Sequence, residues 1–371
     1  MSSASAYANR SLSAARQSAR YRFRLSSPLL ISLAVAGSAA YAYNSNKTNN
    51  NNNGNGNGNG SFLSKALFGF GASSKVATNV REASAKHDQD YYQKVYNAIA
   101  QKLVDVDDYD YGSYAPLLVR LAWHNCGSYD QDDNSPTKGG SYAGTMRFEK
   151  EQGDPENTGL VLGLRYLDSI KDQFPDLSHG DLYTLGGVVG VQEMGGPKIG
   201  WRPGRVDLPI DVTPPYRRLP DAAQTTGSYV RSVFTDRLGF TDQELVVLIG
   251  VGHAIGRCHT KNSGFDGPWT FSPTTISNEF FKLLLSEDWQ FKKWDGKKQY
   301  EDQGSHSLMM LPTDMVMKQD PKMKKYVELY AKDEDRCMKD FADAFSKLLE
   351  RGIKFDSKKM YFKTMEEQGL D

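Results

Sequence analysis

The spacing of apolar residues predicts helices along most of the chain. From Ser84 onward these residues recur with a period of about 3.6, which places them on one face of a helix. Two such faces are Tyr92, Val95, Tyr96, Ile99 and Leu103, and then, near the C-terminus, Phe341, Ala344, Phe345 and Leu348. Sustained alternation of apolar and polar residues, which is typical of strands, is scarce. We therefore expect a mainly α-helical domain.

Helix starts are indicated by a Ser or Thr that is followed by an acidic residue near the third position after it. Three apolar runs open in this way: Ser178 with Asp181 before Leu182, Thr241 with Glu244 before Leu245, and, less regularly, Ser277 with Glu279 before Phe280. The stretch 195–220 is rich in Gly and Pro, which predicts a long ordered loop between helices.

The first 80 residues differ in composition from the rest. Residues 1–25 are rich in Ser, Ala and Arg and contain no acidic residue, as in mitochondrial targeting peptides. The apolar stretch 29–43 is shorter than the ~20 residues of a bilayer-spanning helix and fits a sorting signal. We therefore expect a bipartite mitochondrial presequence at 1–43, a disordered Asn/Gly-rich linker at 44–80 and a folded domain at 81–371. A secretory peptide or signal anchor stays open as the alternative.

The net charge of zero hides an asymmetry along the chain. Glu82 is the first acidic residue, and nine of the 45 basic residues precede it, so 36 basic residues face 45 acidic ones in the remainder. A nucleic-acid-binding domain would concentrate positive charge on its folded part, so this class is disfavoured, and a cationic protein partner is favoured. A polytopic membrane protein is excluded, since no apolar run approaches the ~20 residues of a span.

The three cysteines restrict how a cofactor could be held. Cys126, Cys258 and Cys337 form no C-x-x-C pair, which argues against a zinc knuckle, a disulfide scaffold and a covalently attached c-type haem. Any cofactor is therefore held by other residues.

Two histidines lie in unusual settings. Arg120, Trp123 and His124 share one helix face by their spacing, and a cavity with a polar ligand would give them partners. His253 ends an apolar run among Gly250, Gly252 and Gly256, which leave room for a flat macrocycle, and imidazole is a common metal ligand. The pair suggests opposite faces of one cofactor, while structural histidines with satisfied hydrogen bonds stay open as the alternative.

Several ordered motifs then connect these residues to a known family. They are Val119-Arg-Leu-Ala-Trp-His124, Gly139-Gly-Ser-Tyr142, Gly186-Gly-Val188, Gly195-Gly-Pro-Lys198, Arg218-Leu-Pro-Asp-Ala222, Gly252-His-Ala-Ile-Gly256, Ser263-Gly-Phe-Asp-Gly-Pro-Trp269, Leu311-Pro-Thr-Asp314 and Glu366-Glu-Gln-Gly-Leu370. From about His87 to Asp371 the chain resembles the cytochrome c peroxidases, a mitochondrial branch of the intracellular (class I) haem peroxidases.

The resemblance implies a fold and an activity. The fold would be the mainly α, two-lobed haem peroxidase fold, with haem between a distal lobe (about 81–240 plus C-terminal helices) and a proximal lobe (about 241–340). One haem b, iron protoporphyrin IX, would be bound non-covalently per chain. The enzyme would reduce hydrogen peroxide to water with electrons from ferrocytochrome c, through ferryl haem and a tryptophan radical. It would protect against reactive oxygen species in the mitochondrial intermembrane space, in preference to the matrix.

On the distal side, the resemblance assigns four roles. His124 would transfer a proton between the two oxygen atoms of peroxide, and Arg120 would stabilise the negative charge that develops as their bond breaks. Trp123 would pack over the haem and donate its indole N–H to the ferryl oxygen. Asn157 would accept the His124 N–H and so fix its tautomer.

On the proximal side, the resemblance makes His253 the ligand of the haem iron. Asp314 would accept the N–H of its other ring nitrogen and strengthen the imidazole as an electron donor, which favours high-valent iron. Trp269 would lie beside His253 and lose one electron to form the radical. The haem propionates would be held by Arg257, His259 and Ser263.

Some positions bear on the choice of electron donor. Asn262 and Ala254 stand where ascorbate peroxidases have a substrate-binding Arg and a potassium-binding Thr, which disfavours that family. Thr270-Phe271-Ser272 departs from the Gly-Ala-Ala of yeast cytochrome c peroxidase, so the electron route and a hybrid specificity stay open. Acidic positions that match cytochrome c docking regions are Asp105, Asp107, Asp108, Asp110, Glu366 and Glu367.

A non-enzymatic haem protein, either an electron carrier or a sensor, is the alternative function. In such a protein His124 and His253 would both bind the iron. Arg120 argues against it, because a carrier has no need of a positive charge over the iron.

Overall fold

The computed structural model describes residues 81–370. They belong to one compact unit, which spans Ala72–Asp371. The expected presequence at 1–43 and linker at 44–80 lie outside the described residues, so both stay predictions.

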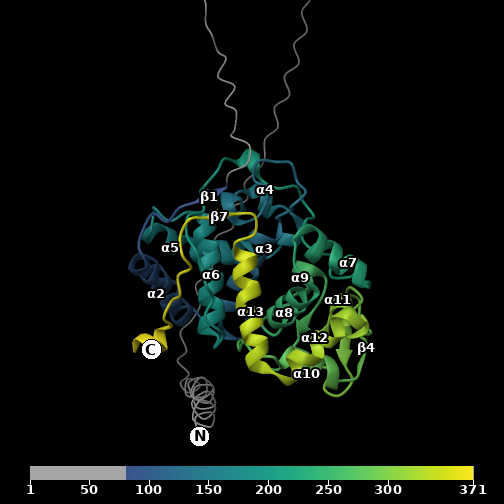
Figure 1. Cartoon of the computed structure of the whole chain (residues 1–371). Helices are drawn as coiled ribbons and strands as arrows, with labels where there is room; N and C mark the ends of the chain where they lie inside the picture. Colours follow the sequence, from purple (N-terminus) through teal and green to yellow (C-terminus); the bar gives the residue numbers. More distant parts are fainter. Residues whose placement is uncertain (1–80, 371) are drawn as a thin grey trace, which may run out of the picture. The chain divides into compact units, whose positions relative to one another are not determined.

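Helices dominate the described part of the chain (Figure 1). The longer ones are α2 (Gln89–Asp105), α3 (Ala115–Gly127), α5 (Val161–Gln173), α6 (His179–Glu193), α8 (Asp242–His253), α10 (Glu279–Ser286), α11 (Pro312–Gln319), α12 (Pro321–Lys332) and α13 (Glu334–Leu349). The shorter ones are α4 (Glu149–Gln152), α7 (Gly227–Arg231), α9 (Thr260–Ser263) and α14 (Met365–Gln368), with the 3₁₀ turns η1 (Asp110–Gly112), η2 (Ser141–Ala143), η3 (Thr145–Arg147), η4 (Pro155–Asn157) and η5 (Ile210–Val212) and the π-helix η6 (Ser232–Arg237).

The strands of the described part are only two or three residues long. β1 (Glu82–Ala83) pairs in parallel with β7 (Lys354–Phe355), and β2 (Arg257–Cys258) pairs antiparallel with β3 (Gly267–Pro268). An antiparallel sheet contains β4 (Trp289–Phe291), β5 (Tyr300–Asp302) and β6 (Met309–Met310) in that order. The fold is therefore mainly α, as the apolar spacing predicts.

The helices form two packed groups that share one helix. α3 lies along α6, and α2 and α5 pack around them. α8 packs against α10, α11 and α12, and α13 contacts both α8 and α3 (Figure 1). The side chain of Lys347 on α13 reaches Glu244 at the start of α8, with Nζ 2.8 Å from Oε1. The histidine expected on the proximal side thus belongs to the second group and the one expected on the distal side to the first.

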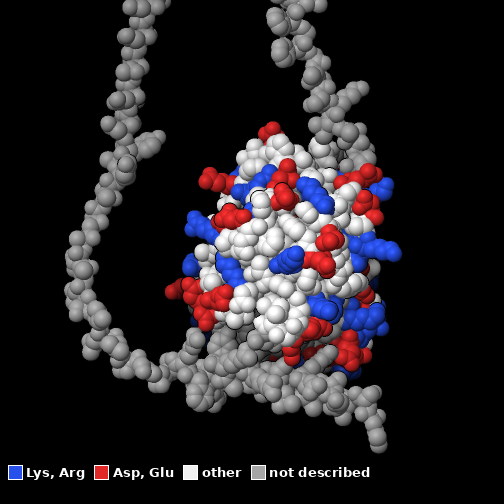
Figure 2. Space-filling model, turned by 90° about the vertical axis from the view of Figure 1, so that its left-hand side faces the viewer, with Lys and Arg blue, Asp and Glu red and all other residues white. Residues whose placement is uncertain are grey.

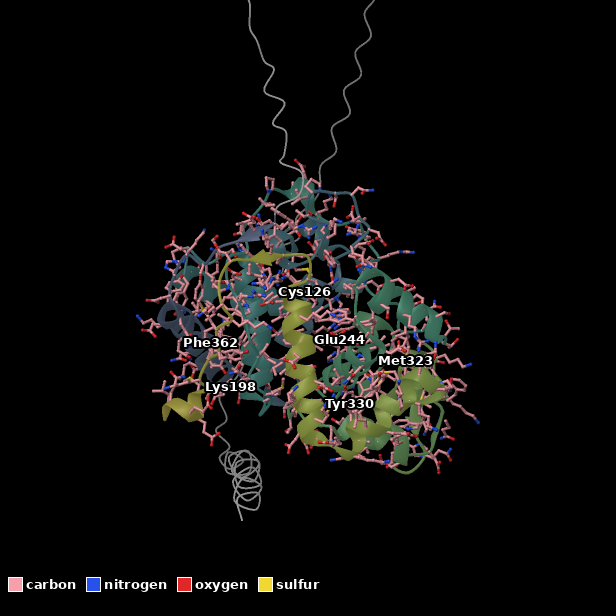
Figure 3. All side chains as sticks on the ribbon, viewed as in Figure 1. Cys126, Lys198, Glu244, Met323, Tyr330 and Phe362 are labelled. Carbon is pink, nitrogen blue, oxygen red and sulfur yellow. The ribbon has the colours of Figure 1, made fainter. Side chains whose placement is uncertain are left out.

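The apolar faces predicted from the spacing are buried against these neighbours. In α2, Tyr92, Val95, Tyr96 and Ile99 are buried, whereas Leu103 is half-buried. The four predicted residues of α13 are all buried. Figure 3 labels Phe362 and Tyr330 in the two groups: Phe362 stacks on Tyr96 with ring centroids 5.6 Å apart, and Tyr330 packs against Phe281 at 5.4 Å.

The predicted helix starts are confirmed to different degrees. Thr241 and Glu244 form a full capping box at the start of α8. Ser178 caps α6, but the carboxylate of Asp181 turns to Arg205 instead of the cap backbone. The third start is shifted by one residue, because Asn278 precedes α10 and Ser277 only accepts a hydrogen bond from the Glu279 N–H.

The stretch 195–220 is an ordered loop, as expected, and a buried ion pair fixes it. Nη1 of Arg205 donates to Oδ1 of Asp181 at 2.8 Å, and its Nη2 donates to the carbonyl of Leu349 at the end of α13 at 2.7 Å. Asp181 also accepts the backbone N–H of Gly204. Both side chains of the pair are almost fully buried. The pair therefore joins the loop to α6 and α13.

Charged and uncharged side chains both lie on the outside of the unit (Figure 2). On the face shown in Figure 2, basic and acidic side chains are interspersed. Within residues 81–370, no helix combines the length and apolar composition needed to cross a bilayer.

We predict that Arg205→Ala destabilises the fold by about 3–5 kcal/mol, because it leaves the buried carboxylate of Asp181 without its cation. Chemical denaturation gives the free energy of unfolding. The matched control is Lys339→Ala, which removes an exposed ion pair with Asp343 (Nζ to Oδ2 3.6 Å) and should leave the midpoint unchanged. Equal midpoints for the two variants would contradict the structural role of the buried pair.

Candidate active site

Asp314 lies at the centre of the first group of predicted site residues. It stands in the first turn of α11, and its side chain is fully buried. Three N–H groups donate to its carboxylate: Nδ1 of His253 to Oδ1, and Nε1 of Trp269 and the backbone N–H of Leu311 to Oδ2, each at 2.8 Å. The helix N-terminus adds favourable positive potential. One carboxylate thereby fixes two side chains that lie 61 and 45 positions away in the sequence.

His253 is the last residue of α8, and its ring stacks on that of Trp269. The ring centroids are 4.4 Å apart and the planes differ by 15°. With Nδ1 engaged by Asp314, Nε2 is the ring nitrogen left for another partner. Among residues 81–370, Nε2 has no hydrogen-bonding partner. The imidazole is therefore oriented and has one nitrogen available to bind a metal ion.

The glycines around His253 serve different purposes. An added Cβ at Gly252 would meet no atom within 4 Å, so this glycine faces open space. A Cβ at Gly250 would come within 2.2 Å of Phe281, and one at Gly256, where φ is +69°, would come within 3.1 Å of Pro116. The expectation that all three make room for a macrocycle therefore holds only for Gly252. The other two permit helix packing and a tight turn.

His124 lies in the second group and is buried on α3. Its Nδ1 is 2.9 Å from Oδ1 of Asn157, whose Nδ2 donates to the carbonyl of Glu151 at 2.8 Å. Since the amide nitrogen of Asn157 donates to Glu151, its amide oxygen faces His124 and accepts a hydrogen bond from Nδ1–H. Burial, and then the nearby Arg120 guanidinium, hold the pKa of His124 well below its ordinary value. His124 thus presents an unprotonated Nε2 at neutral pH.

Arg120 lies one turn before His124 and is held by backbone carbonyls. Its Nη1 donates to Thr158 and its Nη2 to Glu156, both at 3.1 Å. These two residues flank Asn157, so one turn of chain positions both the guanidinium and the imidazole. No acidic side chain pairs with Arg120 in the described part of the chain, and its positive charge stays available to a ligand.

Trp123 is the third member of this helix face. Its ring is parallel to that of Phe234, with centroids 5.5 Å apart and planes 7° apart. Phe234 belongs to the π-helix η6, a form that occurs mostly as single turns at functional sites. This ring contact joins η6 to α3.

A small pocket opens beside His124. Its lining includes His124, Asn157, Glu151, Asp154, Tyr216 and Arg218. The pocket joins the distal residues to the loop 214–219, where Arg217 adopts a φ of +64° and donates its backbone N–H to Asp154. A small polar molecule in this pocket would lie beside the His124 ring.

The residues predicted to hold propionates bind protein groups here. Arg257 donates to Oδ1 of Asp266 at 3.0 Å, and Nε2 of His259 lies 2.9 Å from Oδ1 of Asp110. The Ser263 hydroxyl accepts the N–H of Phe265 at 3.3 Å. Arg257 is the first residue of β2, and His259 and Ser263 lie between β2 and β3, in the segment that follows His253.

The structure thus joins His253, Trp269 and Asp314 in one network, and Arg120, His124 and Asn157 in another. Within residues 81–370, no hydrogen bond connects the two networks. Sequence reasoning missed Phe234 and Glu151. Nothing in the sequence around Phe234 indicates a contact with Trp123. Glu151 lies in the polar run Glu149–Gln152, which is typical of a solvent-exposed turn.

The residues present fit a haem group. Nε2 of His253 is the kind of donor that binds haem iron, and a carboxylate on its other nitrogen is the usual partner of a metal-bound imidazole. The space beside Gly252 allows a flat ring to approach the backbone. Within residues 81–370, no cluster of His, Cys, Asp and Glu could hold a bare metal ion.

Comparisons with known proteins agree with this geometry. The family model described as "Peroxidase" matches residues 93–333. "Cytochrome c peroxidase, mitochondrial" of Yarrowia lipolytica is 57% identical over 264 residues, which cover 71% of this chain and 76% of the relative. The proteins of the same name from Cryptococcus neoformans var. neoformans and Candida albicans are 52% and 51% identical, over 75% and 82% of this chain and 72% and 82% of the relatives. The chain therefore belongs to the peroxidase family, in the group of the mitochondrial cytochrome c peroxidases.

Proposed function

We propose that this chain reduces hydrogen peroxide to water with electrons from ferrocytochrome c and uses one non-covalently bound haem b. The observation that carries the proposal is the Asp314 carboxylate, which binds both His253 and Trp269. These hydrogen bonds would orient His253 to bind an iron and Trp269 to transfer an electron. Relatives that are more than half identical bear the name of this activity.

His253 would bind the haem iron through Nε2. The turn with Arg257, His259 and Ser263 would hold the propionates, and the guanidinium of Arg257 and the ring of His259 would exchange their present carboxylate partners for them. When bound, haem supplies the iron at which the O–O bond of peroxide is broken and the oxidising equivalents are kept. No covalent attachment is expected, because the cysteines lack the required spacing.

The distal residues would move a proton and stabilise charge. Nε2 of His124 takes the proton from one oxygen of peroxide and gives it to the other, which leaves as water. Arg120 stabilises the negative charge that builds on the departing oxygen. Asn157 keeps the Nδ1 proton in place, so the lone pair stays on the reacting side. The indole N–H of Trp123 is available as a further donor.

Trp269 would be the residue that exchanges electrons with the partner. Its indole is buried, stacked on His253 and hydrogen-bonded to a carboxylate, whose negative charge stabilises a radical cation. An electron from ferrocytochrome c then restores the indole. Two such transfers complete one turnover.

The donor would be a cationic protein. Asp105, Asp107 and Asp108 are exposed near the end of α2, and Glu366 is exposed on α14, whereas Asp110 binds His259 and Glu367 binds Lys198. Exposed acids of this kind raise the association rate with a basic partner and lose their effect in salt. Together with the leader composition and the names of the relatives, this favours a peroxide-removing role in the mitochondrial intermembrane space.

We predict that His124→Leu slows the reaction with peroxide by about 10²–10⁴-fold, because general acid–base transfer is lost. Stopped-flow mixing of the ferric holoenzyme with peroxide measures this rate. In the unchanged protein, the rate should stay level from neutral pH to well below ~6.5, since a lowered pKa keeps His124 unprotonated there. His306→Asn is the matched control: it removes an exposed imidazole, and Asn tolerates the φ of +55°. A fast His124→Leu variant would refute the proton-transfer role.

We predict that Trp269→Phe keeps the peroxide step within about twofold and abolishes oxidation of ferrocytochrome c, because the side chain that exchanges electrons is gone. The two rates are followed separately by stopped-flow and steady-state absorbance. Trp294→Phe, which changes a partly exposed indole, should alter neither rate. Continued cytochrome c turnover in Trp269→Phe would remove the electron-transfer role.

The electron donor can be identified by measuring the peroxide-dependent oxidation rates of ferrocytochrome c and of ascorbate side by side. We expect cytochrome c to be used at least tenfold faster, and its rate to fall as salt rises. Equal rates would establish a hybrid enzyme, and a preference for ascorbate would overturn the assignment of the donor.

A further inference from the structure

Glu151 is a buried carboxyl group in the distal pocket that the proposed reaction does not yet use. It lies on the short helix α4, only 4% exposed, and its backbone carbonyl holds Asn157. Its side chain lines the same pocket as His124 and Asn157. The Oε2 atom is buried and has no hydrogen-bonding partner among residues 81–370. A buried carboxylate without a partner is unfavourable, so the site favours a proton on this group.

The charges around Glu151 act in the same direction. Burial and then the neighbouring Asp154 carboxylate raise the pKa of Glu151 to about 7, against a hydrogen bond from Thr145. The other titratable or charged groups near it are His124 on α3, Arg218 and Tyr216 on the pocket loop and Tyr183 on α6. Arg218 is already bound to Asp133 at 2.5 Å, and no cation pairs with Glu151 in the described chain.

Asp154 does not share these properties, although it lines the same pocket. Its Oδ1 accepts the backbone N–H of Glu156 at 3.1 Å, and its Oδ2 accepts that of Arg217 at 2.8 Å. Both oxygens are therefore occupied in holding the turn η4 against the pocket loop. Glu151 is the carboxyl group with an unpaired oxygen.

The proposed reaction requires protons that its electron donor does not bring. One peroxide becomes two waters by taking up two electrons and two protons. Ferrocytochrome c supplies only electrons, and His124 returns to peroxide the proton that it removed. Both protons must therefore enter the pocket from solvent while the electrons arrive. His124 is buried and its Nδ1 proton is engaged, so it needs a group that can reload it.

We propose that the Glu151 side chain relays protons from solvent into the distal pocket that His124 lines. The relay rests on the proposed peroxidase function. In each transfer, the carboxyl group releases its proton to the pocket, and the resulting carboxylate takes one proton from solvent at the pocket opening. No electron moves through it. Glu151 thus acts through His124 and leaves the peroxide-cleaving step to His124 and Arg120.

The test compares holoenzyme variants Glu151→Gln and Glu149→Gln. The first keeps the shape of the side chain, removes the acidic proton of the carboxyl group and avoids a buried charge, so it should fold. The second is the matched control, since Glu149 lies on the same helix α4 but is exposed. Glu151→Asp restores the carboxyl group.

We expect Glu151→Gln to keep the peroxide step within about twofold at neutral pH, and to slow steady-state oxidation of ferrocytochrome c by about tenfold or more with a larger solvent deuterium isotope effect. The inflection of the steady-state rate near pH 7 should disappear, and Glu151→Asp should recover part of the rate. Glu149→Gln should match the unchanged protein throughout.

A second readout does not depend on turnover. Infrared difference spectra of the resting holoenzyme should show a carboxylic C=O band that titrates near pH 7, present in Glu149→Gln and absent in Glu151→Gln. An unchanged rate and pH profile in Glu151→Gln would overturn the relay, as would equal slowing of the peroxide and electron-transfer steps, which indicates a structural role. Failure of the proposed function looks different, because then the unchanged protein does not turn over peroxide at all.

Discussion

The carboxylate of Asp314 is the interaction on which the chemistry of this fold depends. It brings together the end of α8, the strand-to-loop segment that carries Trp269 and the start of α11, which are distant in sequence. Three donors on one buried carboxylate leave the His253 ring a single orientation and a single tautomer. Helices α8 and α11 therefore hold one imidazole nitrogen of His253 in a fixed position.

The two histidines donate to partners of different charge, and this difference distinguishes their roles. His253 donates to a carboxylate, which strengthens it as a ligand, whereas His124 donates to the neutral amide of Asn157. An amide fixes the tautomer without adding negative charge, so burial and Arg120 keep the His124 pKa low. One ring is thereby suited to hold an ion and the other to accept a proton.

Local patterns predicted much of this arrangement, and long-range contacts explain the remainder. The Arg120, Trp123 and His124 face follows from helical spacing, and the caps of α6 and α8 follow from short motifs. The roles of Gly250 and Gly252 differ only because Phe281 packs against one of them, which no spacing reveals. Glu151 is an ordinary charged residue in the sequence, and its burial depends on how the pocket loop folds over α4. Family resemblance supplied the partners of His253 that periodicity could not.

The pairing of β1 with β7 sets a condition on how the domain is completed. Ser84, just after β1, is hydrogen-bonded to Asp356, just after β7, across 272 positions of sequence, with Oγ and Oδ2 2.6 Å apart. Closing so large a loop is entropically unfavourable until the helices between have packed. β1 therefore finds its strand partner only after the chain as far as β7 has left the ribosome. A chain halted before Lys354 leaves β1 without its strand partner.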